Sequence, residues 1–146
     1  VSFVTIFVGS YNTATGRIIY ANGGHPPPFL ISKTGIVNSV GEATGTIVGM
    51  LENQEYRNAE LRLQVGETLL LYTDGFPEAR SASGEFFSNT RIRTFLQNHS
   101  NSSVNELCEA AAREVSQFQN QNLADDITVL ALKRTMGSIS SFFLKL

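Results

Sequence analysis

Carboxylates stand at the ends of two apolar segments, and they are the residues whose type and spacing could support metal chemistry. Asp74 follows the apolar run 69–72, whereas Asp125 and Asp126 precede the apolar run 127–132. Runs that are apolar on both faces are typical of central strands, and folding brings the ends of such strands together. Carboxylates held there repel one another and lose water, so they need a cation or a shared proton. Ligands that are all oxygen suit Mg²⁺ or Mn²⁺.

Each of the residues that could do chemistry also has a structural explanation. Asp74 could open a turn with Gly75, because Asp-Gly is common in turns, and Asp125 could cap a strand. His25 lies between two glycines and three prolines, and we expect a role in that turn rather than as a general acid. Cys108 falls on the apolar side of an expected helix, and we expect an inert core thiol rather than a nucleophile.

The composition is that of one ordinary globular domain. The chain has 146 residues, of which 42% are hydrophobic, and a formal net charge of −2. This charge gives no electrostatic reason to expect nucleic acid or an anionic membrane as a partner. No apolar segment approaches the ~20 residues of a membrane-spanning helix. The single cysteine cannot form an internal disulfide, so the cytoplasm, a reducing compartment, is the expected location.

The first half of the chain is predicted to form β-hairpins. Residues of turn composition at 12–16 separate two β-rich runs, and the turn 33–35 separates two more. Alternation of apolar and polar residues predicts a half-buried strand before the apolar strand that ends at Asp74. The predicted strands are 3–8, 17–21, 29–32, 36–40, 56–63, 69–72 and, near the end of the chain, 127–132.

The second half is predicted to contain two helices. Asn89 and Thr90 can cap a short helix, and its inner face would carry Ile92, Phe95 and Leu96. The clearer helix begins after Ser103, whose spacing to Glu106 is that of a capping box. Its apolar residues recur at spacings of three and four: Val104, Leu107, Cys108, Ala111, Val115 and Phe118.

Three motifs taken together resemble a known family. They are Asn22-Gly23-Gly24-His25-Pro26-Pro27-Pro28, Tyr72-Thr73-Asp74-Gly75 and Asp125-Asp126-Ile127-Thr128. Their order and spacing resemble the metal-dependent serine/threonine phosphatases (PPM), in the bacterial branch typified by SpoIIE and RsbU. The segments 63–67 and 78–80 also match that branch. The resemblance covers almost everything from residue 3 to residue 134, and no domain boundary is visible before Arg134.

The resemblance implies an α+β fold, an antiparallel β-sandwich flanked by helices, with a two-metal centre of Mn²⁺ or Mg²⁺ at one edge. A metal-activated water would attack phosphoserine or phosphothreonine directly, with no catalytic residue beyond the metal ligands. By the same resemblance, Asp74 and Asp125 would be ligands of one metal. The supporting residues around that site would be Gly75, Asp126, Glu78 and His25.

The sequence also departs from the family pattern. The acidic segments that complete both metals in the family have no match here, and the chain starts at Val1 inside an apolar run. We therefore expect residues 1–134 to be the C-terminal portion of such a domain, N-terminally incomplete and inactive alone. Residues 135–146 are expected to be a tail or linker without an assigned role.

The resemblance implies a signalling function for the parent protein. Its substrate would be a phosphorylated regulatory protein, in particular a sigma-factor antagonist partner, and the incomplete chain would self-associate as a homodimer. Two alternatives stay open. The domain could be a catalytically dead, phosphatase-like module that binds a partner or senses a ligand, or it could be an unrelated β-rich structural domain. Acidic motifs upstream would favour the enzyme.

Overall fold

The computed structural model describes residues 3–119 and 126–145, which form two antiparallel sheets and two helices. The three-stranded sheet has the order β1-β2-β5, and the five-stranded sheet has the order β4-β3-β6-β7-β8. The strands are β1 (Ile6–Tyr11), β2 (Arg17–Gly23), β3 (Phe29–Ile31), β4 (Val37–Ser39), β5 (Ala59–Arg62), β6 (Thr68–Tyr72), β7 (Thr128–Thr135) and β8 (Ser138–Lys145). The helices are α1 (Ser88–Asn98) and α2 (Val104–Phe118).

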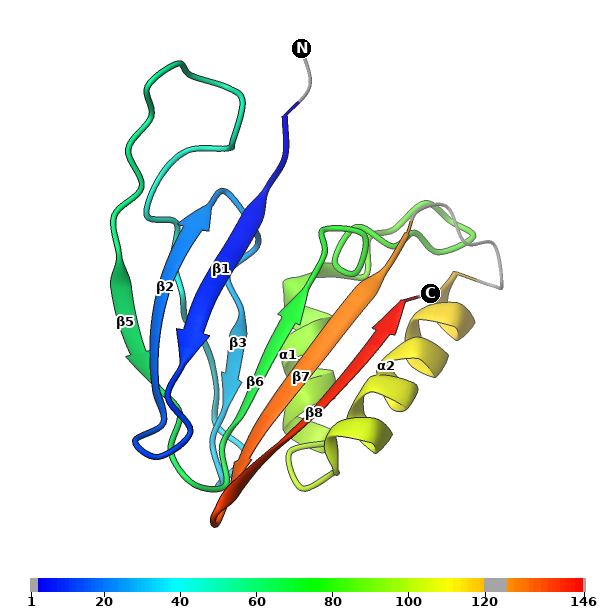
Figure 1. Cartoon of the computed structure of the whole chain (residues 1–146). Helices are drawn as coiled ribbons and strands as arrows, with labels where there is room; N and C mark the ends of the chain where they lie inside the picture. Colours follow the sequence, from blue (N-terminus) through cyan, green and yellow to red (C-terminus); the bar gives the residue numbers. More distant parts are fainter. Residues whose placement is uncertain (1–2, 120–125, 146) are drawn as a thin grey trace.

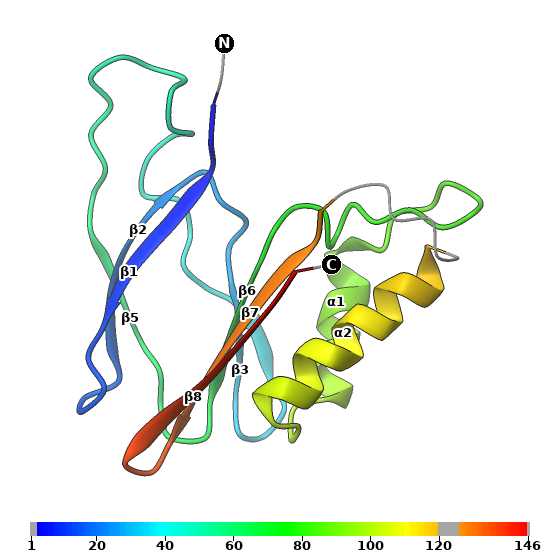
Figure 2. The same ribbon diagram turned by 45° about the vertical axis from the view of Figure 1, so that its right-hand side comes forward.

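The elements form three layers. The two sheets face each other, and both helices cover the opposite face of the five-stranded sheet, as Figures 1 and 2 show. This arrangement confirms the predicted antiparallel sandwich flanked by helices. Within the described residues, neither helix has the length and apolar content needed to cross a bilayer.

Two apolar clusters fill the spaces between these layers. Between the sheets lie the buried residues Ile18, Tyr20, Leu63 and Leu69, with partly buried neighbours around them. The second and larger cluster joins the five-stranded sheet to the helices, and β6 contributes Leu70 and Tyr72 to it. Strand β6 therefore has apolar side chains on both faces, as its sequence predicted.

Helix α2 is confirmed with its predicted bounds. The Ser103 hydroxyl accepts a hydrogen bond from the Glu106 amide at 3.3 Å, and the Glu106 carboxylate accepts one from the Ser103 amide at 2.9 Å. This reciprocal capping box satisfies amide groups that the first helical turn leaves without partners. The predicted inner residues Val104, Leu107, Cys108, Ala111 and Val115 are buried.

Helix α1 is also present, but its predicted cap is wrong. The helix begins at Ser88, and Phe87 at the cap position makes no side-chain hydrogen bond. Phe87 is buried instead, so apolar packing rather than a polar side chain fixes this helix start. The predicted inner residues Ile92, Phe95 and Leu96 are all buried.

The end of the chain differs from the prediction of a tail or linker. Residues 138–145 form β8, which pairs with β7 along its length, from Thr135↔Ser138 to Thr128↔Lys145. Main-chain hydrogen bonds to the edge of β7 thus give this short segment a fixed place in the sheet. Strand β7 extends to Thr135, beyond the predicted end at residue 132.

Candidate metal centre

The end of β6 presents Asp74 in a single helical turn. The Phe76 amide donates to the Thr73 carbonyl, and the Glu78 amide donates to the Asp74 carbonyl, both at 3.0 Å. The Asp74 carboxylate accepts a hydrogen bond from the Gly75 amide at 3.0 Å, as expected of a turn-forming aspartate. Asp74 is nevertheless exposed, so its carboxylate is open to a ligand from solvent.

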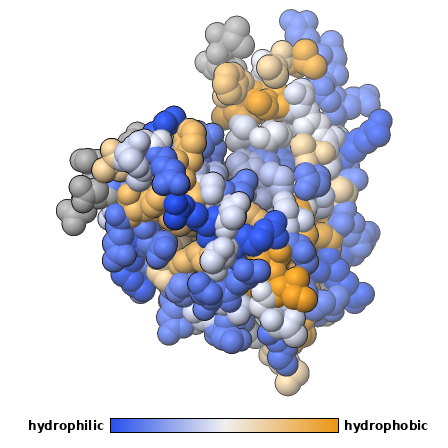
Figure 3. Space-filling view, turned by 180° about the vertical axis from the view of Figure 1, so that it is seen from behind, coloured by the Kyte–Doolittle hydropathy of each residue, from blue (hydrophilic) through white to orange (hydrophobic). Residues whose placement is uncertain are grey.

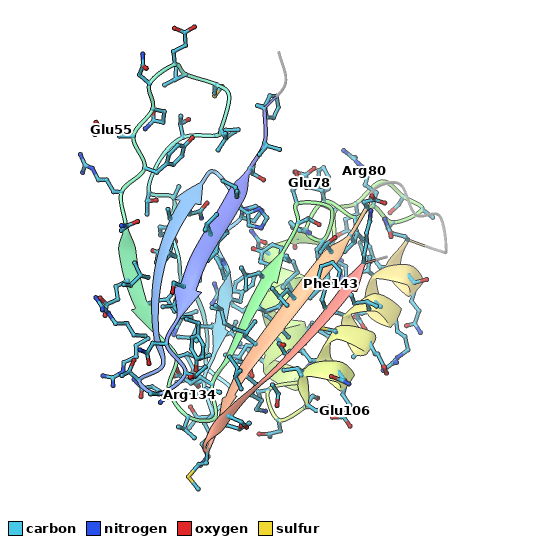
Figure 4. The ribbon with its side chains drawn as sticks, in the orientation of Figure 1. Glu55, Glu78, Arg80, Glu106, Arg134 and Phe143 are labelled. Carbon is cyan, nitrogen blue, oxygen red and sulfur yellow. The ribbon has the colours of Figure 1, made fainter. Side chains whose placement is uncertain are left out.

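Glu78 lies four residues after Asp74 in the same turn. Residues at this spacing in a helical turn have their Cβ atoms about 5–6 Å apart, and both side chains are exposed. Figure 4 shows Glu78 in the loop beyond the end of β6. The turn therefore carries a second exposed carboxylate.

The start of β7 is held directly against this turn. The Thr73 hydroxyl donates to the Asp126 carbonyl at 3.4 Å and accepts from the Thr128 amide at 3.0 Å. The Thr73 amide donates to the Thr128 carbonyl at 3.1 Å. The structure thus brings together the ends of the two apolar strands, and Thr73 is the residue that joins them.

Of the two acidic residues before β7, Asp126 lies within the described residues. Asp125 lies outside the described residues, so its position beside Asp74 stays a prediction. The Asp126 side chain is 74% exposed, and its Oδ2 atom lies 2.6 Å from the Nζ atom of Lys145. Asp126 therefore carries a lysine partner from β8.

His25 lies close enough to Asp74 to feel its charge. Burial lowers the pKa of His25, while the Asp74 carboxylate and the Tyr72 carbonyl partly offset this effect. The ring atom Nδ1 lies 3.3 Å from the Thr5 hydroxyl. His25 is thus a half-buried neighbour of the acidic site, and its burial favours the neutral form of the imidazole ring.

Asn22 fixes the turn that carries His25. Its side chain is fully buried. The Asn22 amide group donates to the carbonyls of His25 and Gly41 at 3.0 and 2.8 Å, and its Oδ1 atom accepts from the His25 amide at 2.8 Å. This network supports the predicted structural role of the His25 turn.

Three residues that shape this region had no predicted role: Asn22, Thr73 and Lys145. Asn22 and Thr73 stand inside the motifs that carried the resemblance, and an asparagine before a Gly-Gly-His turn is a usable signal. Lys145 had no signal, because its place depends on the pairing of β8 with β7.

The donors present at this edge fit a hard divalent cation. Asp74 and Glu78 on one chain segment and Asp126 on the other carry carboxylates, whose oxygens Mg²⁺ and Mn²⁺ prefer. Asp74 and Asp125 would hold the ion, and Asp126 would support the site from outside its ligand shell. Among residues 3–119 and 126–145, no three His, Cys, Asp or Glu residues form a metal-binding group.

A small apolar hollow adjoins the acidic edge. It measures about 250 Å³, and its lining includes His25, Thr73, Leu130 and Phe143. A larger hollow of about 960 Å³ lies near the start of α2, lined by Asn101 and Glu106 among others, and has no link to the predicted chemistry. The face seen in Figure 3 is mainly hydrophilic, with separate apolar areas.

The fold and these motifs place the chain among the SpoIIE/RsbU-like domains of the PPM phosphatase family. Residues 1–135 match the family described as Stage II sporulation protein E (SpoIIE). The chain therefore belongs to the SpoIIE family, which confirms the predicted SpoIIE/RsbU-like branch of the PPM phosphatases.

Individual relatives agree with this assignment. Protein IcfG of Synechocystis sp. is 34% identical over 134 residues, covering 90% of this chain and 21% of that protein. Phosphoserine phosphatase RsbU of Bacillus subtilis is 28% identical over 132 residues, covering 90% of this chain and 39% of that protein. The chain thus spans well under half the length of both, and it is related to serine phosphatases.

A solved structure supports the fold. The phosphatase domain of the cell fate determinant SpoIIE from Bacillus subtilis, presoaked with Mn, superposes with a TM-score of 0.72. The identity is 14%, and the match covers 92% of this chain and 58% of that chain. This likeness shows the shared architecture.

Proposed function

We propose that this chain is part of a metal-dependent protein phosphatase that hydrolyses phosphoserine or phosphothreonine on a regulatory protein. The observation that carries the proposal is the contact between the Asp74 turn and the start of β7, made through Thr73 and Gly75. This contact brings two acidic chain segments to one exposed edge, next to a half-buried histidine. The RsbU relative, named a phosphoserine phosphatase, supports the substrate class.

The residues of the chain would act mainly by holding a cation and by positioning the segments around it. Asp74 and Asp125 would bind one cation, and Thr73 keeps their two segments in register. Bound cations would supply an activated water and neutralise charge on the phosphoryl oxygens. Asn22 holds the His25 turn against this edge, and His25, kept neutral by burial, adds no cation to compete with a metal.

We further propose that catalysis needs more of the domain than this chain contains. The match covers 58% of the SpoIIE phosphatase domain, so a large part of that domain has no counterpart in this chain. A two-metal centre needs more ligands than Asp74 and Asp125 supply. The chain alone should therefore be inactive, and the longer parent protein should carry the activity in the cytoplasm.

The partner proposals rest on the relatives and on the exposed apolar residues. A phosphorylated regulatory protein, such as a sigma-factor antagonist partner, is the proposed substrate.

The segment around β1 exposes Phe3, Val4, Ile6 and Val8, and we propose that these residues drive formation of a homodimer. A clean monomer in sedimentation at low micromolar concentration would contradict that dimer.

Mn²⁺ titration of the chain tests the metal site. Asp74→Asn keeps the side-chain shape and removes the charge, so it should abolish most of the Mn²⁺ binding at this edge. Glu55→Gln is a matched control, because Glu55 is exposed on a distant loop (Figure 4). Binding that survives Asp74→Asn would show that the site has been misplaced.

Activity tests the rest of the proposal. The chain alone should not hydrolyse a phosphoserine peptide, whereas the longer parent should do so with Mn²⁺ and lose most of its rate with Asp74→Asn. A parent that binds Mn²⁺ through a full set of carboxylates and stays inactive would favour the alternative, a phosphatase-like binding or sensing module.

A further inference from the structure

Strand β8 lies outside the part of the chain that matches the family, yet it reaches the acidic edge. The family match ends at residue 135, and β8 begins at Ser138. Because β8 runs antiparallel to β7, its last residue, Lys145, pairs with Thr128 at the start of β7. Figures 1 and 2 show the end of β8 beside that start.

This pairing brings the ammonium group of Lys145 to the edge of the candidate site. The Lys145 Nζ atom lies 2.6 Å from Asp126 Oδ2. The main-chain carbonyl of Asp126 is in turn hydrogen-bonded to Thr73, the residue before Asp74. A positive charge is therefore bound to Asp126, the residue that follows the predicted ligand Asp125 in the sequence and whose main chain contacts the turn that carries Asp74.

The Lys145–Asp126 pair contributes little to the free energy of unfolding. The two side chains are 57% and 74% exposed, and exposed pairs of this kind contribute little because water and salt screen them. The charge acts more strongly on a divalent ion at the same edge, since the two cations repel each other through space and one of them carries two charges.

Arg80, a cation in the loop after β6, is engaged elsewhere. Its guanidinium lies 4.1 Å from the centre of the Phe86 ring and donates to the Gly84 carbonyl at 3.4 Å. Figure 4 shows Arg80 out on the loop beyond β6. Lys145 is thus the cation that the fold brings onto an acidic residue of the site.

We propose that Lys145 is a tethered cation that weakens divalent-metal binding at the Asp74 edge, so that β8 sets the metal affinity of this chain. The inference rests on the metal site of the proposed function. A metal ion that binds there must approach against the Lys145 charge, and its own charge repels the ammonium from Asp126. Removal of the charge should tighten metal binding, and metal binding should release the ammonium.

Mn²⁺ titrations of the full chain at low ionic strength test this. Lys145→Gln should bind Mn²⁺ about two- to five-fold more tightly, as Coulomb's law gives for a unit charge and a divalent ion about 10 Å apart in water. Lys145→Glu should bind more tightly still, and Lys145→Arg should match the wild type. Lys33→Gln is the matched control, because Lys33 lies in the turn between β3 and β4, away from the site. The gain should shrink as salt shortens the Debye length from about 30 Å at 0.01 M to about 3 Å at 1 M.

A second measurement uses the unmodified chain. If the ammonium leaves Asp126 when a metal binds, Mg²⁺ should raise the rate at which acetic anhydride labels Lys145 relative to Lys33. Both results support the proposal. Lys145→Gln with unchanged or weaker Mn²⁺ affinity, or labelling of Lys145 that Mg²⁺ leaves unchanged, would overturn it.

The same series separates this proposal from the proposed function. Mn²⁺ binding that is lost in Asp74→Asn but insensitive to Lys145 would overturn the role of Lys145 and leave the metal site standing. Absence of Mn²⁺ binding in every variant, or binding insensitive to Asp74→Asn, would overturn the metal site and the role of Lys145 with it.

Discussion

Gly75 packs directly against the main-chain carbonyl of Asp126. A Cβ atom at Gly75 would lie 2.7 Å from that oxygen and 3.3 Å from the Ile127 side chain, closer than the backbone can tolerate without moving. The missing side chain of this glycine therefore lets the Asp74 turn and the start of β7 touch. The spacing of the acidic edge depends on this contact.

The substitution Gly75→Ala should push the two segments apart. We expect several-fold weaker Mn²⁺ binding and a loss of about 1–3 kcal/mol in the free energy of unfolding, as for other overpacked sites. Gly9→Ala is the matched control, because a Cβ there would meet Ile18 at an ordinary 3.4 Å. Equal Mn²⁺ affinity in Gly75→Ala and the wild type would show that this contact does not set the site.

Local signals made the central strands and α2 predictable from the sequence. The run 69–72 is apolar on both faces because helices cover one face and the second sheet the other. The Ser103–Glu106 capping box lies within four residues of sequence, so its hydrogen bonds could be read from spacing. Where such signals are local, the predicted elements match the structure.

The place of β8 and the contacts of Asn22 and Lys145 could not be predicted from short sequence patterns. Strand β8 contains Ile139, Phe142 and Phe143, which favour strands, but serines separate them, and its place comes from pairing with the free edge of β7. The role of Asn22 depends on the Gly41 carbonyl, 19 residues away. The Lys145–Asp126 contact depends in turn on the register of β8, which the two-residue turn 136–137 sets.

Leu107 should be a major contributor to stability. It is 2% exposed in the cluster between α2 and the five-stranded sheet. Leu107→Ala should lower the free energy of unfolding by ~2–5 kcal/mol, since it removes buried methyl groups and leaves a cavity. Urea denaturation measures the loss, with Asn105→Ala on the exposed face of α2 as the control. A loss under about half a kcal/mol would mean that this part of the core collapses around the cavity.

The thiol of Cys108 should be unreactive in the folded chain. Burial raises the pKa of its thiol to about 11, so little thiolate is present near neutral pH, and its side chain is 0% exposed. A thiol-specific reagent such as Ellman's reagent should react with the unfolded chain and not with the folded one. Rapid stoichiometric labelling at pH 7.5 without denaturant would contradict this.

Arg134 joins the two sheets at the end of the molecule opposite the candidate site (Figure 4). Its guanidinium donates to the carbonyls of Ala14, Thr15 and Leu63 at 2.8, 3.1 and 2.9 Å. Lysine keeps the charge but lacks the planar fork that reaches several carbonyls. Arg134→Lys should therefore cost about 1–3 kcal/mol in denaturation, and a neutral effect would show that one ammonium replaces the fork.

His25 should make the chain less stable in mild acid. Burial lowers its folded pKa below the ordinary value of 6.5, so the unfolded chain takes up a proton first as the pH falls. The contribution of His25 to stability is therefore complete above about pH 6.5 and is lost as the pH falls through the lowered folded pKa. Between pH 7.5 and pH 5, the wild type should lose more free energy of unfolding than His25→Gln.

The same histidine reports the charge of Asp74. The Asp74 carboxylate raises the pKa of His25 against the larger effect of burial, so its removal should let burial act alone. In an NMR titration of the His25 ring, Asp74→Asn should therefore move the midpoint to still lower pH, and Glu55→Gln should leave it in place. An upward shift in Asp74→Asn would mean that the two side chains do not interact across this edge as the structure places them.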